Sequence, residues 1–363
     1  MKKINFTILI PCLNESESIG FCIKKITKVF LKTNYTYEIL VADNGSTDLS
    51  KEISKSLGAR VITVKKRGYG YALRTGISKA LGQNIIFADA DNSYDFLELK
   101  KFLLCFEKNH DFVIGCRLPS NGGKIKSGAM PLLHKYLGNP LFSFLTKIFF
   151  NVKFNDVYCG FRGFSKEVYK KNTYYCGHMD FAIENAIKCF KSSKNPIEIP
   201  ITLHKDSRVN TKSHLKTFVD GFKTLKLLLI FSPKYLFLIP GYVIIVMSLL
   251  IPYSFQEEIK TIFNIDAIFI IPSLFIFGFQ LIFFSVYADL FSSYLEFRTK
   301  KNYFEHIHEK FLYIFSIILV LFAIILQINK FDIHIQPYFF LYLGLMIIIN
   351  TILLSFFKLV FNK

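Results

Sequence analysis

Four long apolar segments in the last third of the chain constrain its fold more than any other feature. Each is close to the roughly 20 residues that a helix needs to cross the hydrocarbon core of a bilayer. Helices in the core of a soluble protein can be equally apolar, but four such segments in series favour a multi-pass membrane domain over residues 235–363. The four segments lie near residues 235–251, 267–290, 311–328 and 337–357.

The positive charges in the loops predict how these helices are oriented. The loop between the second and third segments carries Arg298, Lys300, Lys301 and Lys310, whereas the other two loops hold one lysine each beside acidic residues. Because short loops rich in Lys and Arg remain on the cytoplasmic side, we expect this loop, both termini and the N-terminal domain to be cytoplasmic. Residues 214–234 mix lysines with Leu, Phe and Ile, a pattern that predicts an amphipathic helix at the membrane surface.

The composition narrows the classes of partner. The chain is 52% hydrophobic and has 45 Lys and Arg against 27 Asp and Glu, a formal net charge of +18. A chain that is both apolar and basic suggests an anionic membrane surface or phosphorylated substrates. It lacks the zinc-finger spacing or coherent basic helix that would suggest a nucleic-acid partner.

Seven scattered cysteines, none in a C-x-x-C pair, favour reduced thiols in a cytosolic domain. A homo-oligomer is left open.

Strand and helix patterns alternate along residues 1–213. Short β-rich apolar runs occur at residues 4–10, 38–42, 60–64, 85–88, 111–116 and 196–203. Between them, helical spacing is found at residues 16–32, 71–81, 97–108, 132–150 and 181–190. Such alternation is typical of βαβ units, and it predicts an α/β domain with a mostly parallel sheet.

Two carboxylates, Asp89 and Asp91, follow the apolar run at residues 85–88. Ligands of open α/β sheets bind at the carboxyl ends of the strands, and side chains two residues apart on an extended chain point the same way. Two carboxylates so close together stay ionised only if a cation joins them. Mg²⁺ and Mn²⁺ prefer such oxygen ligands and are commonly shared with substrate phosphates. A metal–diphosphate site and a polar turn with helix-capping Asp residues both fit this stretch alone.

Several motifs, in this order along the chain, resemble those of the family 2 glycosyltransferases. The shared motifs are Pro11–Glu15, Asp43–Asp48, Arg67–Gly70 with Ala72 and Gly76, and Asp89–Asp91. Two more, Gly115–Arg117 and Asp156–Arg162, resemble the polyprenyl-phosphate sugar synthases, of which dolichyl-phosphate mannose synthase is the best-known type. The resemblance covers residues 4 to about 234. It implies a GT-A (Rossmann-like) fold, a UDP- or GDP-linked sugar donor and a polyprenyl phosphate acceptor.

The resemblance also implies a set of donor-binding residues. They are Pro11, Asn14, Glu15, Asp43, Gly45, Ser46, Gly68, Gly70, Asp89, Ala90 and Asp91. Structural alternatives exist for several of them: a helix start for Asn14 and Glu15, a capped turn for residues 43–48, and a simple turn for the two later glycines.

Asp89 and Asp91 would hold a Mg²⁺ or Mn²⁺ ion against the donor diphosphate, which makes them the first candidates for catalytic residues. The type synthase often has Gln two positions after the second Asp, as a further ligand. Here that position is Ser93, so the third protein ligand is left open.

Arginines are candidates for binding phosphate, because the guanidinium fork suits a pair of phosphate oxygens. The resemblance favours Arg117 for the acceptor phosphate and Arg208 for phosphate binding in the loop that follows the last strand. His134 and Lys135 are further candidates for the lipid phosphate, with solvated surface as the alternative. For Arg162, an ion pair with Asp156 is expected.

These features predict an inverting, metal-dependent transfer of one sugar to a polyprenyl phosphate. A phosphate acceptor is already largely deprotonated at pH 7 and needs no base. The first alternative is a membrane glycosyltransferase that acts on a sugar hydroxyl, which requires a carboxylate base and would make Asp156 or Glu184 essential. The second alternative is a membrane protein that uses the domain only to bind.

Overall fold

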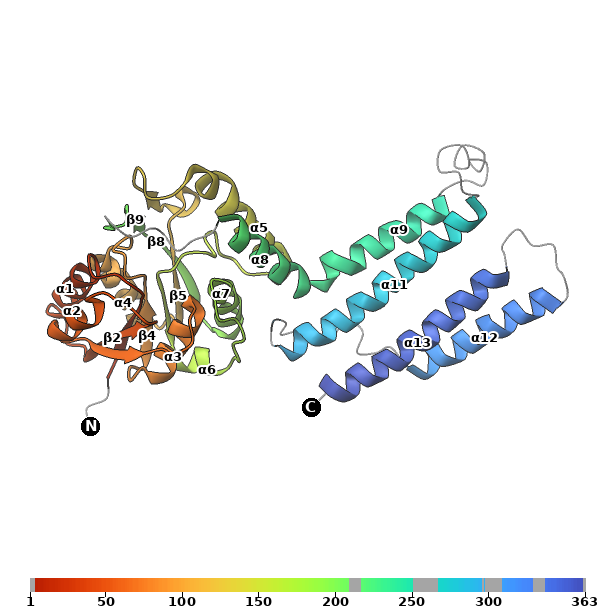
Figure 1. Cartoon of the computed structure of the whole chain (residues 1–363), viewed down its shortest axis with the longest axis horizontal. Helices are drawn as coiled ribbons and strands as arrows, with labels where there is room; N and C mark the ends of the chain where they lie inside the picture. Colours follow the sequence, from red (N-terminus) through yellow and green to blue (C-terminus); the bar gives the residue numbers. More distant parts are fainter. Residues whose placement is uncertain are drawn as a thin grey trace. The chain divides into compact units, whose positions relative to one another are not determined.

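The computed structural model describes residues 4–208, 217–250, 267–295, 297, 309–328 and 337–361. The chain divides into two compact units, Met1–Leu227 and Leu228–Lys363 (Figure 1). This boundary falls inside the predicted amphipathic segment, of which residues 214–216 lie outside the described residues. Arg298, Lys300 and Lys301, on which the predicted orientation depends, also lie outside them.

The first unit is built on a seven-stranded sheet with the strand order β3-β2-β1-β4-β7-β5-β8 (Figure 1). β7 runs antiparallel to its neighbours β4 and β5, and every other adjacent pair in this sheet is parallel. The predicted mostly parallel sheet is therefore confirmed. The strands are β1 (Phe6–Cys12), β2 (Tyr37–Asp43), β3 (Arg60–Thr63), β4 (Asn84–Phe87), β5 (Phe112–Cys116), β7 (Arg162–Ser165) and β8 (Pro196–Pro200).

Helices connect these strands and pack in two groups. α1 contacts α2 and α4, whereas α3 contacts α7. α1 shows the reason: its buried residues recur at helical spacing, so one apolar stripe faces inward. The helices are α1 (Ile19–Phe30), α2 (Ser50–Ser56), α3 (Tyr69–Lys79), α4 (Leu99–Glu107), α5 (Asn139–Phe150), α6 (Lys166–Lys170), α7 (Phe181–Ser192) and α8 (Thr217–Ile230).

The strands differ from the sequence expectation at three places. β1 continues through Pro11 to Cys12, where only β2 pairs with it, because the pairing with β4 ends at Leu9 and a proline is tolerated where a strand has one neighbour. The run at residues 196–203 breaks after Pro200, and its last residues form β9 (Thr202–Leu203), which pairs with β6 (Lys124–Ile125) in a separate small sheet. β7 was not predicted as a strand, because its residues Arg162–Ser165 contain a single large apolar side chain and so form no apolar run.

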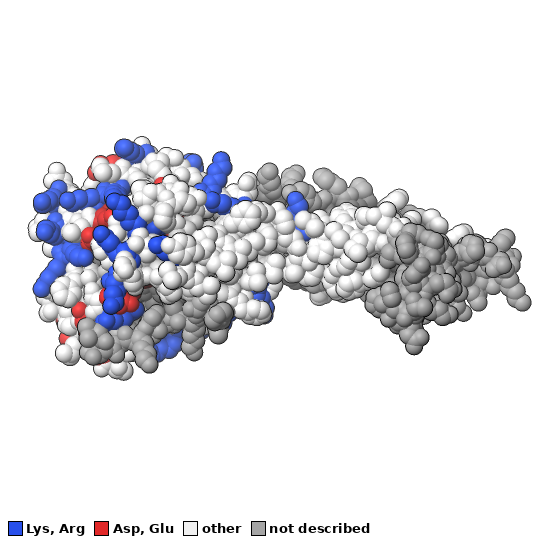
Figure 2. Space-filling view, turned by 90° about the horizontal axis from the view of Figure 1, so that it is seen from above, with Lys and Arg blue, Asp and Glu red and all other residues white. Residues whose placement is uncertain are grey.

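Lys and Arg side chains gather over the first unit, whereas the described surface of the second unit is mostly uncharged (Figure 2). The second unit contains a helix at each of the four predicted apolar segments. These helices are α9 (Ile239–Leu250), which continues a π-helical turn at Lys234–Leu238, α11 (Ala267–Tyr294), α12 (Glu309–Ile328) and α13 (Pro337–Phe361).

The prediction of four membrane spans is supported only in part. Among the described residues, two helices are long and apolar enough to cross a membrane, Pro272–Tyr294 in α11 and Phe339–Phe356 in α13. A third span results if the bent pair Gly221–Ile230 and Lys234–Leu250 counts as one. In α12 the described apolar stretch, Lys310–Ile325, is shorter than a span.

Small residues allow the helices of the second unit to approach closely. A Cβ on Gly278 of α11 would lie 2.8 Å from the carbonyl oxygen of Gly241 in α9, and a Cβ on Gly241 would lie 2.7 Å from that of Gly278. Close backbone approach at glycines is a common way for helices to associate in lipid. A polar contact joins α11 to α13, where the side chains of Gln280 and Asn350 bond to each other at 2.8 and 3.2 Å.

Gly278→Leu is expected to destabilise this unit by about 1–3 kcal/mol, because the new side chain overpacks a backbone contact that has no free space. The measurement is the thermal unfolding of the detergent-solubilised full chain. Phe277→Leu is the matched control, because Phe277 is the neighbouring residue and its side chain is exposed. Equal unfolding temperatures for the two variants would contradict the close packing.

Candidate active site

The predicted donor-binding residues converge at the carboxyl ends of three adjacent strands. Asn14 and Glu15 follow β1, Asp43 is the last residue of β2, and Asp89 and Asp91 follow β4. Because β2, β1 and β4 are neighbours and mutually parallel, these ends lie along one edge of the sheet. This is the edge at which open α/β sheets bind ligands.

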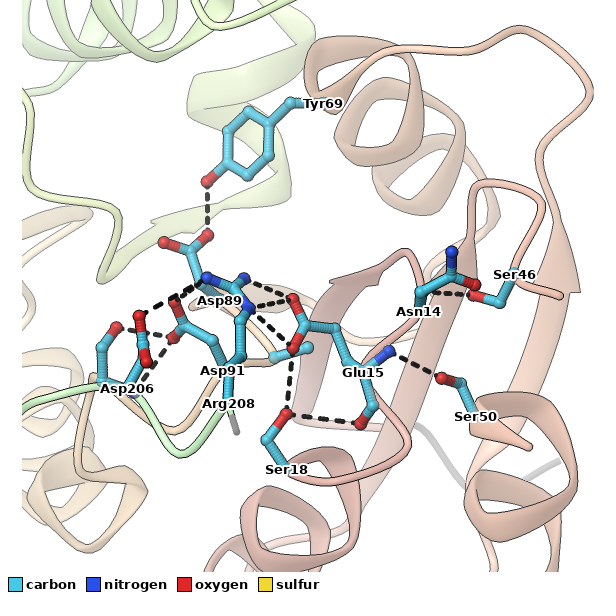
Figure 3. Close-up of polar contacts among 12 residues, drawn as sticks. Asn14, Glu15, Ser18, Ser46, Ser50, Tyr69, Asp89, Asp91, Asp206 and Arg208 are labelled. Carbon is cyan, nitrogen blue, oxygen red and sulfur yellow. Dashed lines mark hydrogen bonds and ion pairs between the residues drawn. The ribbon is translucent and has the colours of Figure 1, made fainter. Parts of the chain in front are cut away.

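Asp89 and Asp91 lie close together at this edge, each held by different donors (Figure 3). The Tyr69 hydroxyl donates to Asp89 Oδ1 at 2.9 Å. Asp91 Oδ1 accepts from the hydroxyl of Ser93 at 2.6 Å and from its backbone N–H at 3.0 Å. Burial, and then repulsion by Asp91, raise the pKa of Asp89 to about 6. A cation at this place would relieve that repulsion.

Arg208 lies beside this pair and contacts three carboxylates (Figure 3). Its Nε is 3.1 and 3.2 Å from the two carboxylate oxygens of Glu15, and its Nη2 is also paired with that group. Its Nη1 is 3.3 Å from Asp91 Oδ2 and 3.7 Å from Asp206 Oδ2. The guanidinium therefore places positive charge beside Asp91 Oδ2, whereas Ser93 bonds to Oδ1.

Hydrogen bonds join the segment that carries Arg208 to the turn that carries Asp91. The backbone N–H of His204 donates to the Ser93 carbonyl at 2.8 Å, and that of Ser207 donates to the Asp91 carbonyl at 3.0 Å. The Asn92 side chain donates to the Ser207 hydroxyl at 2.8 Å. The two segments thus form one unit, and Arg208 is positioned by the backbone as well as by its charge.

Asn14 and Glu15 join the loop after β1 to the loop after β2 (Figure 3). The backbone N–H of Asn14 donates to the Ser46 hydroxyl at 2.9 Å, and that of Glu15 donates to the Ser50 hydroxyl at 2.8 Å. The Asn14 side chain accepts from the Thr47 N–H at 2.8 Å. Both residues lie just before α1, so the structural alternative of a loop leading into a helix applies to them. Their donor-binding role stays a prediction.

Asp43 stabilises the turn that follows it. Its carboxylate accepts from the backbone N–H groups of Gly45 at 3.1 Å and Ser46 at 3.2 Å, and the side chain is completely buried. Asp48 accepts from the N–H of Ser50 at 3.0 Å, at the start of α2. The turn that the sequence offered as an alternative is therefore present, although the N-cap residue of α2 is Leu49 and Asp48 lies one position before it. Contact of Asp43 with a nucleoside stays a prediction.

The glycines at the start of α3 have a packing role. A Cβ on Gly68 would lie 2.4 Å from the carbonyl oxygen of Gly177, and one on Gly70 would lie 2.7 Å from the same residue. The space that these glycines leave is thus filled by the segment before α7. Their predicted contact with the donor stays a prediction, and close packing alone already accounts for glycine at both positions. Of the other predicted donor residues, Pro11 and Ala90 are buried in the backbone framework of this edge.

Arg117 and Asp156 form a buried ion pair. Arg117 Nε lies 2.7 Å from Asp156 Oδ2, and Nη2 lies 2.8 Å from Oδ1. The backbone N–H of Arg117 also donates to Oδ2 at 2.9 Å. Burial alone would lower the pKa of Arg117, but Asp156 and then Tyr94 hold it well above its usual value. Asp156 is fully buried.

The ion pair expected between Arg162 and Asp156 is wrong. The guanidinium of Arg162 is fully buried and bonds to backbone carbonyls, at 2.7 Å to Cys159 and 2.7 Å to Val157, and also to Ala182. Arg162 therefore fills a cage of carbonyl oxygens beside β7, while Asp156 is neutralised by Arg117.

Glu184, the other candidate base, is engaged in packing α7. It is fully buried, accepts from the N–H groups of Tyr175 and Cys176 at 2.8–3.1 Å, and pairs with Lys188 at 3.0 Å. These contacts give Glu184 a structural explanation, and its role as a base stays a prediction.

His134 and Lys135 lie in a π-helical turn, η3 (His134–Gly138), directly before α5. Burial, and then the charge of Arg117, lower the pKa of His134. The predicted contact of His134 and Lys135 with the acceptor stays a prediction.

Two tyrosines to which the sequence analysis assigned no role contact the candidate site residues. Tyr69 holds Asp89, and the Tyr94 hydroxyl accepts from Arg117 Nη1 at 3.3 Å and from the Gly160 N–H at 2.7 Å. Tyr94 lies three residues after Asp91, so it couples the carboxylate turn to the Arg117–Asp156 pair. Tyr69 could have been noticed, because it belongs to the Arg67–Gly70 motif.

The carboxylate pair fits a divalent cation that is shared with a substrate. Among the described residues, no group of three or more His, Cys, Asp or Glu side chains is arranged to hold a metal. Mg²⁺ needs no such group, since it commonly uses one or two carboxylates, waters and substrate phosphates. Burial and repulsion by Asp91 raise the pKa of Asp89, and a cation between the two carboxylates would oppose both effects.

Comparison with known proteins identifies the family. The family model described as glycosyl transferase family 2 matches residues 7–173. The low-salt glycan biosynthesis hexosyltransferase Agl6 of Haloferax volcanii is 32% identical over 288 residues, which cover 78% of this chain and 68% of that protein. The chain belongs to glycosyl transferase family 2. Glycosyltransferase AglJ of the same organism is 26% identical over 198 residues, 54% of this chain and 62% of that protein.

Membership in this family confirms three of the sequence predictions: the family, the GT-A fold of the first unit and glycosyltransferase activity. Among solved structures, glucosyl-3-phosphoglycerate synthase from Mycobacterium tuberculosis, determined with Mn²⁺ and UDP, has a TM-score of 0.48 at 16% identity. The match covers 62% of this chain and 78% of that enzyme. At this level of likeness, the ligands of that enzyme say nothing about the ligands of this chain.

Proposed function

We propose that the protein transfers a single sugar from a nucleotide-sugar, UDP- or GDP-linked, to a polyprenyl phosphate at the cytoplasmic face of a membrane, with inversion and with Mg²⁺ or Mn²⁺ as cofactor. The chief support is the Asp89–Asp91 pair at the carboxyl ends of the parallel strands, in a glycosyltransferase that also contains helices able to span a membrane. A site of that kind must meet a soluble donor and a lipid acceptor together.

The transfer itself is a displacement at the anomeric carbon of the sugar. An oxygen of the acceptor phosphate forms the new bond to this carbon, and the bond to the donor diphosphate breaks, its electron pair leaving with the nucleoside diphosphate. The bound metal would neutralise charge on the departing diphosphate. Asp89 and Asp91 would hold the metal, and Arg208 would add a second positive charge on the same side.

The environment of the candidate bases favours a phosphate acceptor over a sugar hydroxyl. A hydroxyl acceptor needs a base that can reach it. Asp156 is buried and bonded through both oxygens to Arg117, and Glu184 is buried and paired with Lys188. An acceptor phosphate needs no base, because it is largely ionised at pH 7. Arg117, whose side chain is 10% exposed whereas that of Asp156 is 0% exposed, is a proposed contact of that phosphate, together with His134 and Lys135.

The relatives suggest the kind of sugar and pathway. Agl6 is named as a hexosyltransferase of low-salt glycan biosynthesis. We therefore propose a hexose as the transferred sugar and a surface glycan as the eventual product. Every nucleotide-hexose reacts by the same displacement at its anomeric carbon, so a panel of donors identifies the sugar.

The test uses membranes that contain the full chain, with Mg²⁺ or Mn²⁺, a polyprenyl phosphate and a panel of radiolabelled nucleotide-hexoses. Label that moves into a mild-acid-labile lipid, and does not move without metal, is the expected result. Transfer only to a lipid-linked saccharide would replace the proposal by the hydroxyl-acceptor enzyme. Donor binding with no transfer in either assay would favour a binding protein.

Arg208→Gln is expected to tighten the binding of Mn²⁺ alone by about tenfold while lowering turnover, because its guanidinium competes with a cation for Asp91 but assists the diphosphate. Free Mn²⁺ measured by electron paramagnetic resonance gives the affinity without donor or activity. Lys205→Gln, an exposed neighbour with the same change of charge, is the control. If both variants shift the affinity for Mn²⁺ alike, Arg208 does not compete with the metal for Asp91.

A further inference from the structure

Helix α5 (Asn139–Phe150) buries polar side chains and exposes apolar ones, the reverse of a helix on the surface of a soluble domain. Its small and polar residues Asn139, Ser143 and Thr146 are buried, at spacings of four and three residues. Of its large apolar residues, Phe150 is buried on the same side, whereas Leu141, Phe144 and Ile148 are exposed. Normally the apolar stripe of a surface helix faces the core and the polar stripe faces water.

The outward stripe is long and continuous. In α5 it consists of Leu141, Phe144 and Ile148, which are 44%, 57% and 42% exposed. The preceding turn η3 extends it, with Tyr136 and Leu137 exposed at 69% and 57%. Leu137, Leu141, Phe144 and Ile148 follow one another at three- to four-residue spacing, so they share one face, and Tyr136 is the neighbour of Leu137.

Helix α8 (Thr217–Ile230) lies beside α5 and adds to this surface. A Cβ on Gly221 of α8 would lie 3.8 Å from the ring of Phe142 in α5, so the two helices are in contact (Figure 1). The next residue of α8, Phe222, is 69% exposed. We call the surface formed by Tyr136, Leu137, Leu141, Phe144, Ile148 and Phe222 the apolar face.

We propose that the apolar face lies in the headgroup and upper acyl region of the bilayer, so that α5 is a second membrane-surface element beside the α8 segment. Soluble monomers rarely expose a contiguous apolar surface of this kind. Moving apolar side chains out of water is favourable in proportion to the apolar area that is buried. The inference requires only that the protein is a membrane protein, and it stands whichever acceptor is used.

Lipid fits this face better than a partner protein does. α5 with η3 is too short to span a bilayer and is apolar on one side only, which is the pattern of a helix that lies in the interface. The chain itself contains helices long and apolar enough to span a membrane. Lys135 and Lys147 lie on the same stretch and are partly exposed, as expected beside anionic headgroups.

The position of the face has a consequence for the site. The η3 turn that begins the stripe carries His134 as well as Leu137. A bilayer that contacts Leu137 would therefore bring its headgroup phosphates to the level of His134. In this way the apolar face would set the height of the active site above the lipid.

The absence of tryptophan from the sequence makes a sharp test possible. A single tryptophan is introduced in the full chain at Leu137 or at Phe144, and each variant is reconstituted into phosphatidylcholine vesicles with and without bromine on the upper acyl chain. Bromine quenches tryptophan only on contact, so the loss of fluorescence reports lipid at that position. Leu49→Trp and Leu104→Trp, at exposed apolar sites near α2 and in α4, are the matched controls.

We expect brominated lipid to reduce the emission of Leu137→Trp and Phe144→Trp at least twofold more than that of the controls. Equal quenching at all four positions would overturn the inference. A blue-shifted emission at Leu137 and Phe144 without quenching would also overturn it, because protein, from this chain or from a second copy, would then cover the face. Far-ultraviolet circular dichroism and thermal unfolding of each variant show that the domain is folded, whichever acceptor is used.

Discussion

Asp91→Asn is expected to lower turnover by about a thousandfold, or about 4 kcal/mol of transition-state stabilisation. The amide removes a negative charge from the place where the metal and the diphosphate must meet, and it leaves Arg208 with one carboxylate fewer at 3.3 Å. The side chain keeps its shape, so the Ser93 contacts at Asp91 Oδ1 can persist. The measurement is the single-turnover rate with labelled donor at saturating metal.

Asp206→Asn is the matched control for this prediction. Asp206 lies 3.7 Å from the same guanidinium but is 35% exposed and has no place in the carboxylate pair. An ion pair of that kind contributes about 0–1 kcal/mol, so its loss should change turnover no more than about fivefold. Comparable losses in both variants would mean that the negative charge around Arg208 matters in general, and that Asp91 has no special role as a ligand.

The backbone of the site was largely predictable because it depends on local patterns. The run at residues 85–88 predicted a strand followed by two carboxylates, and β4 with Asp89 and Asp91 is what the structure has. The same holds for the turn after β2, where short-range hydrogen bonds of Asp43 and Asp48 decide the conformation. Such interactions link residues a few positions apart, so the sequence displays them directly.

The partners of the long charged side chains were not predictable in this way. Arg208 reaches Glu15 across 193 positions, and Arg117 reaches Asp156 across 39. Arg162 is closer to Asp156 in sequence, which suggested the wrong pair. Nearness along the chain says little about a guanidinium that can extend in several directions, and only the packing around β7 decides that Arg162 turns toward carbonyl groups.

The orientation of α5 shows a second limit of sequence patterns. The spacing of its Leu and Phe residues predicts a helix with one apolar side, but the same spacing serves a helix facing a protein core and a helix facing lipid. The distinction depends on what the opposite side packs against. In this domain Ser143 and Thr146 pack inward, and this could be known only from the fold.

Asp156→Asn is expected to destabilise the first unit by about 3–5 kcal/mol, because it leaves Arg117 buried with its charge uncompensated. Both carboxylate oxygens bond to the guanidinium, at 2.7 and 2.8 Å, and Arg117 is only 8% exposed. The free energy of unfolding is measured by denaturant titration of the solubilised full chain. If Asp156 were instead a base for a hydroxyl acceptor, the variant would lose activity while its stability stayed near that of the wild type.

The double variant Arg117→Met/Asp156→Leu separates these roles. Replacing a buried ion pair by apolar side chains of similar volume is often neutral or stabilising, so much of the lost stability should return. Activity should not return, because Arg117 is the proposed contact of the acceptor phosphate. A double variant that is both stable and active would show that the pair serves the fold alone. One as unstable as Asp156→Asn would show that the carboxylate acts through its bond to the Arg117 backbone N–H, at 2.9 Å, more than through the ion pair.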